Sequence, residues 1–120
     1  MYGFDEDTDL SFLIGKEICQ VCIGSYDVQL NWGNGGISAT GEFRFKPSGC
    51  GEEIKWRGDA QEIESAARTV RLLKASIVEV KCTRNILTLL FSNGDKLDLI
   101  DDERYESLTI SNGKDTLIVV

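Results

Sequence analysis

Residues 85–100, with the sequence NILTLLFSNGDKLDLI, decide the fold. This stretch places an apolar run on each side of Asn93-Gly94, and an Asn-Gly pair in that setting predicts a β-hairpin. Both residues of the pair tolerate the positive φ angles of a type I′ turn, so we expect that turn type here. A second stretch, Tyr26–Ala39, repeats the design around Asn34-Gly35. The sequence therefore predicts two hairpins of one kind.

The strands of the earlier hairpin show the period of two that is typical of half-buried antiparallel strands. Apolar Val28, Leu30 and Trp32 alternate with polar residues, which places Trp32 in the core. The alternation continues through Ile37–Phe45, which we interpret as one long third strand that bends at Gly41.

A single helix is predicted over roughly residues 60–74. Asp59 is a suitable N-cap, and Glu62 three residues later completes a capping box. The apolar residues that follow recur at helical spacing and predict a stripe packed on a sheet. These residues are Ile63, Ala66, Ala67, Val70 and Leu73.

The two halves of the chain match each other when one is shifted by 59 residues. The shift places Leu30 on Leu89 and Asn34-Gly35 on Asn93-Gly94. We therefore predict one domain over residues 1–120, with halves at about 15–57 and 74–120 and the helix at about 60–74. The predicted class is α+β, with two pseudo-repeated antiparallel β units, sandwich or half-barrel-like, and one amphipathic helix between them. A further hairpin around Asn112-Gly113 is expected to close the second half.

The charge balance constrains the partners. The chain has 13 basic and 20 acidic residues, a net charge of −7. Phosphates of nucleic acids and anionic membranes repel such a chain, so a charged partner should be basic. The first residues show neither a cationic segment nor a long apolar run, and no stretch approaches the length of a membrane span. We therefore expect a cytoplasmic protein that binds neither nucleic acid nor membrane.

The four cysteines offer two interpretations. Cys19 and Cys22 form a C-x-x-C pair, and Cys50 and Cys82 are available to complete a zinc site. In a strand, however, side chains three residues apart point to opposite faces. Cys19 and Cys22 would then not face the same metal ion, as the two cysteines of a zinc knuckle do. Cys19 and Cys82 fit better as small core residues, so no metal or other cofactor is expected.

Catalytic chemistry has little support in the sequence. The chain contains no histidine, and no P-loop, G-x-S-x-G or H-E-x-x-H motif is present. A hydrolase that uses only carboxylates stays possible, because paired acids can perform acid–base catalysis. With so many acidic residues, pairs arise by chance, and we expect a protein that is not an enzyme.

A dense group of carboxylates follows the second hairpin, with a tyrosine inside it. It is either a solvated turn or a contact surface for a basic partner, with the tyrosine as an aromatic anchor. The spacing does not fit a calcium-binding loop. The candidate partner-binding residues are Asp98, Asp101, Asp102, Glu103, Tyr105 and Glu106.

Several segments resemble a family of small uncharacterised bacterial proteins, some of them encoded beside polymorphic or contact-dependent toxins. In the second half these are LTLLFSNGDKLDLIDD (Leu87–Asp102), YESLTI (Tyr105–Ile110) and the terminal TLIVV, and in the first half LIGKEICQVCIGSYDVQLNW. The resemblance implies an α+β fold and an immunity role. It transfers no functional residues, and the cysteine pair is not part of the family pattern.

These observations favour an immunity protein that binds a cognate toxin, a basic nuclease for example, and covers its active site. An acidic surface would associate rapidly with the basic face that such an enzyme needs for its substrate. The first alternative is a small non-enzymatic module that binds another protein through a sheet face or edge. The second is a zinc-binding module.

Overall fold

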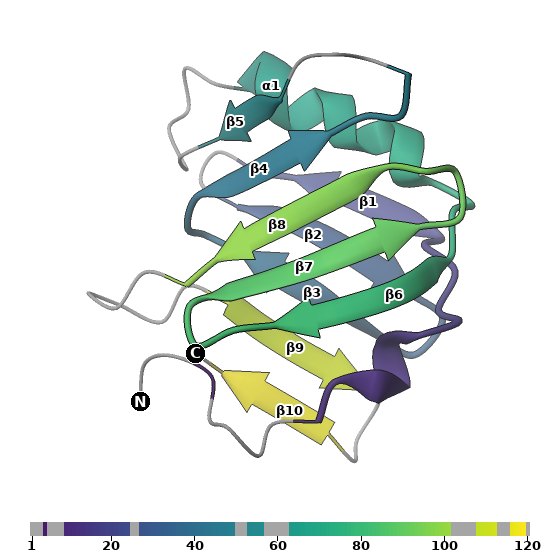
Figure 1. Cartoon of the computed structure of the whole chain (residues 1–120), viewed down its shortest axis with the longest axis vertical. Helices are drawn as coiled ribbons and strands as arrows, with labels where there is room; N and C mark the ends of the chain where they lie inside the picture. The colour runs from purple at the N-terminus through teal and green to yellow at the C-terminus, as the bar shows by residue number, and fades with distance from the viewer. Residues whose placement is uncertain are drawn as a thin grey trace.

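A computed structural model shows two antiparallel sheets lying face to face, with their strands crossing at an angle (Figure 1). It describes residues 4, 9–24, 27–49, 53–56, 63–101, 108–112 and 116–119. In spatial order the first sheet contains β1 (Gln20–Ile23), β2 (Val28–Trp32), β3 (Gly35–Ala39), β9 (Leu108–Asn112) and β10 (Thr116–Val119). The second contains β5 (Ile54–Trp56), β4 (Phe43–Lys46), β8 (Lys96–Ile100), β7 (Ile86–Phe91) and β6 (Ile77–Cys82).

The two halves of the chain are interlocked through these sheets. Strands β1, β2 and β3 form a meander in the first sheet, and β6, β7 and β8 form one in the second. The hairpin that follows each meander joins the opposite sheet. Strand β4 pairs with β8, with Phe43 opposite Leu99, and β9 pairs with β3, with Leu108 opposite Ala39. Each half therefore completes the sheet that the other half begins.

The predicted α+β class, with two antiparallel β units and one helix between them, is confirmed. The predicted single strand Ile37–Phe45 is wrong, because the chain leaves the first sheet after Ala39 and enters the second at Phe43. Ala39, Phe43 and Phe45 are all buried. Buried positions continue to fall on every second residue where the chain passes from the first sheet to the second. The sequence pattern therefore does not reveal that the chain changes sheets.

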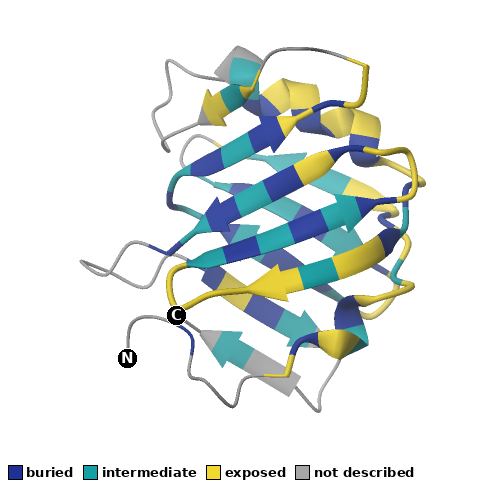
Figure 2. Ribbon diagram, viewed as in Figure 1, coloured by how far each residue is buried: buried dark blue, intermediate teal, exposed yellow. Residues whose placement is uncertain are grey.

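Between the sheets lies a continuous apolar core (Figure 2). As predicted, the inward residues of β2 and β7 belong to it, with Trp32 buried at the end of β2. Full burial of such side chains stabilises the fold by about 1.5–3 kcal/mol each. The largest fully buried ones are Phe43, Phe45, Leu13, Ile18, Ile37, Leu72, Ile77, Leu87, Leu89, Leu97 and Leu108.

The helix is tighter than predicted. Helix α1 (Ile63–Ala67) continues directly as a 3₁₀-helix, η3 (Arg68–Leu72). With three residues per turn, the buried face repeats every third residue and consists of Ala66, Thr69 and Leu72. The predicted α-helical stripe is wrong at Ala67, Val70 and Leu73, which are all exposed. The proposed cap residues Asp59 and Glu62 lie outside the described residues.

One corner joins the two sheets through the backbone. The chain before β1 pairs with the chain entering β6, through a bridge between Glu17 and Ser76. Ile18 N donates to Ala75 O at 2.9 Å, and the short 3₁₀-helix η1 (Ser11–Leu13) packs near β6. This pairing does not extend around the molecule, so the sheets do not form a closed barrel.

Both Asn-Gly hairpins form, but neither has a type I′ turn. Trp32 pairs with Gly35, so the first loop is Gly33-Asn34, and neither of these residues has a positive φ. In the second hairpin Phe91 N donates to Asp95 O, and of the three residues between them only Gly94 has a positive φ, +89°. A three-residue loop with glycine in that conformation is an alternative to the two-residue turn. The expected hairpin of β9 and β10 also forms.

Candidate functional site

Asp98, the first of the predicted contact residues, lies on the outer face of the second sheet. It belongs to β8 and stands between Arg44 of β4 and Thr88 of β7 in the strand register. Thr88 Oγ1 donates a 2.6 Å hydrogen bond to Asp98 Oδ1. The side chain is half-buried, so this carboxylate is held in place rather than free in solvent.

Asp101 occupies a different environment. It follows β8 directly and is only 4% exposed, and its backbone N–H donates to Asn85 O at 2.7 Å in the β6–β7 turn. The prediction that Asp101 contributes to an exposed surface is therefore wrong for this residue. Asp101 instead marks the end of the sheet, directly before the acidic residues Asp102, Glu103 and Glu106, and we call the sequence from Asp101 to Glu106 the acidic segment.

The remaining candidates are Asp102, Glu103, Tyr105 and Glu106. They lie outside the described residues, and their contact role stays a prediction. Residues 102–107 connect Asp101 with β9, which begins at Leu108.

The fold also brings Glu42 to the end of β8, directly before Asp101. Ile100 N donates to Glu42 O at 3.0 Å, which sets this residue beside the last residue of β8. Its carboxylate is 3.8 Å from Arg44 Nη2. Nothing in the sequence signals the approach, because it depends on the pairing of β4 with β8. We call Glu42, Asp98 and Asp101 together the acidic end.

On β5, β4 and β8, the charged residues of the outer face beyond the acidic end are cations. Lys46 and Lys96 are exposed and stand directly opposite each other on β4 and β8. Lys55 of β5 stands opposite Arg44. Because like charges on facing strands destabilise a sheet, the arrangement is unfavourable unless other charges compensate it. The acidic end is thus bordered by positive charge, and a basic partner would be limited to that end.

A second polar cluster surrounds Asp95, which the sequence analysis did not single out. The Asp95 carboxylate is fully buried and accepts 2.7 Å hydrogen bonds from Ser48 N and from Arg71 Nε. Asn93 Nδ2 donates to the same carboxylate at 3.1 Å and to Arg71 O at 3.3 Å. The cluster ties the second hairpin to η3 and to the loop after β4. Its carboxylate oxygens already have partners, which indicates a structural role.

The cysteines are more exposed than predicted. Cys19 and Cys82 are exposed, so their interpretation as core residues is wrong, and Cys22 is half-buried. Partial burial nevertheless raises the pKa of the Cys82 thiol. Cys50 lies outside the described residues. In the part of the chain that the structure describes, no three His, Cys, Asp or Glu side chains come together as a metal site.

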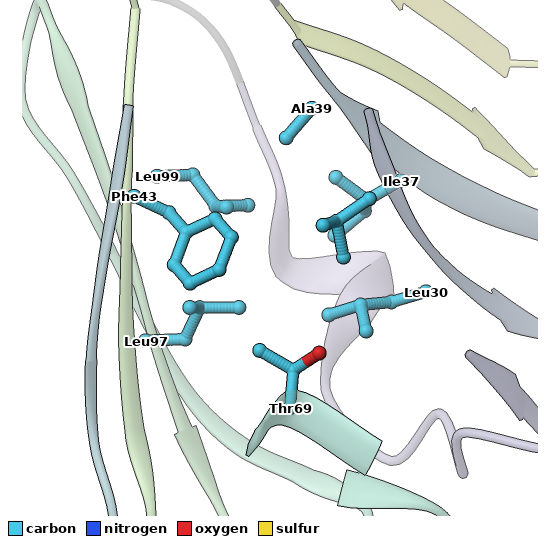
Figure 3. A pocket seen from close by; sticks show the side chains of 8 residues that line it. Leu30, Ile37, Ala39, Phe43, Thr69, Leu97 and Leu99 are labelled. Carbon is cyan, nitrogen blue, oxygen red and sulfur yellow. The ribbon is translucent and has the colours of Figure 1, made fainter. Parts of the chain in front are cut away.

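Between the sheets there is a cavity of about 10 Å³ (Figure 3). Thr69 Oγ1 points toward it but already donates to Ala66 O at 2.7 Å. A space of this size holds at most about one water molecule, so it is not a ligand site. The lining residues are Val28, Leu30, Ile37, Ala39, Phe43, Thr69, Leu97 and Leu99.

Neither a family model, nor a curated protein, nor a solved structure matches this chain. Within the described ranges, no helix has the length and apolar character needed to cross a membrane. The candidate site is therefore defined by geometry and charge alone.

Proposed function

We propose that this protein is a non-enzymatic immunity protein that binds a basic nuclease toxin of bacterial origin and covers its active site. The observation that carries the proposal is the acidic end, where Glu42 and Asp98 lie beside the start of the acidic segment at Asp101. A nuclease needs a basic surface to hold phosphates, and an acidic protein that covers this surface excludes the substrate.

The position of β8 supports this function. Strand β8 is the central strand of the second sheet, and its neighbours β4 and β7 hold it on both sides. The hydrogen bonds of Ile100 to Glu42 and of Asp101 to Asn85 fix its end. Asp101, where the acidic segment begins in the sequence, is therefore held at a fixed point of the sheet, and a partner that binds there loses little entropy in ordering it.

The charge of the whole molecule supports the same conclusion. At a net charge of −7, the protein attracts a basic partner over a distance of about 8–10 Å at physiological salt. Long-range attraction of this kind raises the association rate more than the affinity. Close contacts by Glu42, Tyr105 and the surrounding carboxylates would then determine how long the complex lasts.

The test uses the product of the gene that adjoins the gene for this protein, which the proposal expects to be a basic nuclease domain. We expect the two purified proteins to form a complex and nuclease activity to be lost in it. Glu42→Lys, and separately Asp102→Lys with Glu103→Lys, should each weaken the complex at least about tenfold, equivalent to about 1.4 kcal/mol. Association should also slow as salt rises.

Glu79→Lys is the matched control, because Glu79 is an exposed carboxylate on the same face but at the edge strand β6. It should leave the affinity within about threefold of wild type. The proposal fails if no adjoining gene encodes a basic nuclease domain, or if Glu42→Lys and the double variant Asp102→Lys with Glu103→Lys bind as tightly as Glu79→Lys. Tight binding to a partner with no toxic activity would instead favour the protein-binding module.

A further inference from the structure

Four cations gather on the outer face of the second sheet, which is turned toward the viewer in Figure 1. They are Arg44 and Lys46 on β4, Lys55 on β5 and Lys96 on β8, and we call them the cation cluster. In the strand register Arg44 stands opposite Lys55, and Lys46 stands opposite Lys96. Like charges that face each other across paired strands destabilise a sheet. Two unfavourable pairs thus lie at neighbouring outward positions of β4.

Carboxylates of the same chain offset these charges only in part. Lys46, Lys55 and Lys96 are exposed, and within the described ranges none of them forms an ion pair. Arg44 Nη2 lies 3.8 Å from Glu42 Oε2, but the buried Nε–H of Arg44 has no acceptor among the described residues. A buried donor without a partner costs free energy. The cluster therefore has both the charge and an unused donor for anionic groups of a binding partner.

The cation cluster adjoins the acidic end. Lys96 and Asp98 are two residues apart on β8, so their side chains share a face and lie about 7 Å apart. Arg44 and Lys46 have the same spacing on β4, with Arg44 on the side of Glu42. A partner that binds the acidic end therefore meets the cation cluster with the neighbouring part of its own surface.

This juxtaposition of charges restricts the chemistry of the partner. A nucleic acid or an anionic membrane does not fit, because its phosphates would lie against the acidic end of a molecule with a net charge of −7. A protein surface with carboxylates beside cations does fit. The active site of a metal-dependent nuclease has this composition, because basic residues hold the phosphates and carboxylates hold the divalent metal ion.

Building on the proposed function, we propose that the toxin is a metal-dependent nuclease and that the cation cluster binds the carboxylates that hold its metal ion. Lysine and arginine side chains then take the place of the divalent cation, while the acidic end covers the phosphate-binding residues. The toxin cannot bind this protein and its metal ion at the same site together. By linkage, each weakens the binding of the other.

The test measures the dissociation constant of the complex with the product of the adjoining gene, in metal-free buffer with EDTA and in excess MgCl₂. Sodium chloride keeps the ionic strength of the two buffers equal, so that general screening is the same in both. We expect the affinity to be at least about tenfold lower in MgCl₂, because magnesium occupies the carboxylates that the cation cluster binds.

The double variant Lys46→Gln with Lys96→Gln tests the cluster itself and keeps the apolar part of both side chains. It should bind at least about tenfold more weakly than wild type in metal-free buffer, and MgCl₂ should then change its affinity less than about threefold. Both substitutions make the protein more acidic, which by itself favours a basic partner. Weaker binding therefore indicates lost contacts with anions of the toxin.

Lys81→Gln is the matched control, because Lys81 is an exposed lysine on the same face, at the edge strand β6 and 3.5 Å from Glu79. It should keep the affinity of wild type and its dependence on MgCl₂. Thermal unfolding of the double variant should give a melting temperature no lower than that of wild type, because the variant removes the repulsion between Lys46 and Lys96. Its weaker binding is then not a loss of fold.

Two results overturn this inference and leave the proposed function standing. One is equal affinity of the wild-type protein in the two buffers. The other is an effect of MgCl₂ that persists in the double variant, because magnesium would then act on the acidic end instead. Absence of a complex in both buffers overturns the proposed function itself, and this inference with it.

Discussion

Arg71 Nε lies 2.7 Å from Oδ2 of Asp95, and the two side chains of this ion pair have very different surroundings. The Asp95 side chain is fully buried, whereas that of Arg71 is 43% exposed. The pair connects the end of the 3₁₀-helix to the second hairpin, two elements that meet only in the folded protein. The carboxylate also binds Ser48 N, so it joins three segments at one point.

We expect Asp95→Ala to lower the free energy of unfolding by about 1–3 kcal/mol, because it removes the buried carboxylate that accepts partly buried hydrogen bonds from Ser48 N, Arg71 Nε and Asn93 Nδ2. The exposed ion pair of Glu79 with Lys81 is the control, and Glu79→Ala should change stability by less than about 1 kcal/mol. Urea unfolding measures both. Equal losses for the two variants would contradict the structural role of Asp95.

Gly94→Ala should also destabilise the protein, by about 1–3 kcal/mol. Gly94 has a φ of +89°, and an added Cβ would stand 2.7 Å from Ser48 Oγ and 3.0 Å from Ser48 Cβ. Gly33→Ala, in the other hairpin, is the control because no atom lies within 4 Å of its added Cβ and its φ is not positive. A shift in melting temperature for Gly33→Ala as large as that for Gly94→Ala would refute this account of the two turns.

Leu72 and Leu73 test the 3₁₀ geometry directly. Leu72 is fully buried and Leu73 is 41% exposed, although an α-helical stripe would bury Leu73. We expect Leu72→Ala to cost about 2–5 kcal/mol and Leu73→Ala less than about 1 kcal/mol, measured by chemical denaturation. A larger loss of stability for Leu73→Ala than for Leu72→Ala would mean that this segment is α-helical and buries Leu73.

Asp101→Lys should reduce stability rather than act only on binding. Asp101 is buried, and a lysine there would have to bury its charge or displace the chain. We expect a loss of about 2 kcal/mol or more in the free energy of unfolding. The exposed Glu79→Lys should lose less than about 1 kcal/mol. Retention of full stability in Asp101→Lys would contradict the buried position.

Much of the fold is readable from local patterns. The alternation of Val28, Leu30 and Trp32 predicts a strand with one buried face, and the Asn-Gly pairs mark where strands reverse. Both signals lie within a few neighbouring residues, because side-chain direction and turn conformation are local properties. The structure confirms the hairpins and a helical segment between the two halves, but it divides the predicted strand Ile37–Phe45 between β3 and β4.

The candidate site depends on the tertiary structure. The sequence groups Asp98 and Asp101 with the acidic residues that follow, but only the strand pairing buries Asp101 and brings Glu42 beside Ile100. Likewise, Ala39 and Phe43 keep one alternating phase although they belong to different sheets. A period of two specifies which side chains share a face, and it carries no information about the strand that lies alongside.

Local chemistry thus determined where the strands, turns and helix form. Long-range packing decided which sheet receives each strand, which face of the helix is buried and which carboxylates stay accessible. Neighbouring residues determine the positions of the strands, turns and helix through backbone and side-chain geometry. The assignment of strands to sheets and the burial of particular side chains depend on burying the apolar faces of both halves together, because each half completes the sheet of the other.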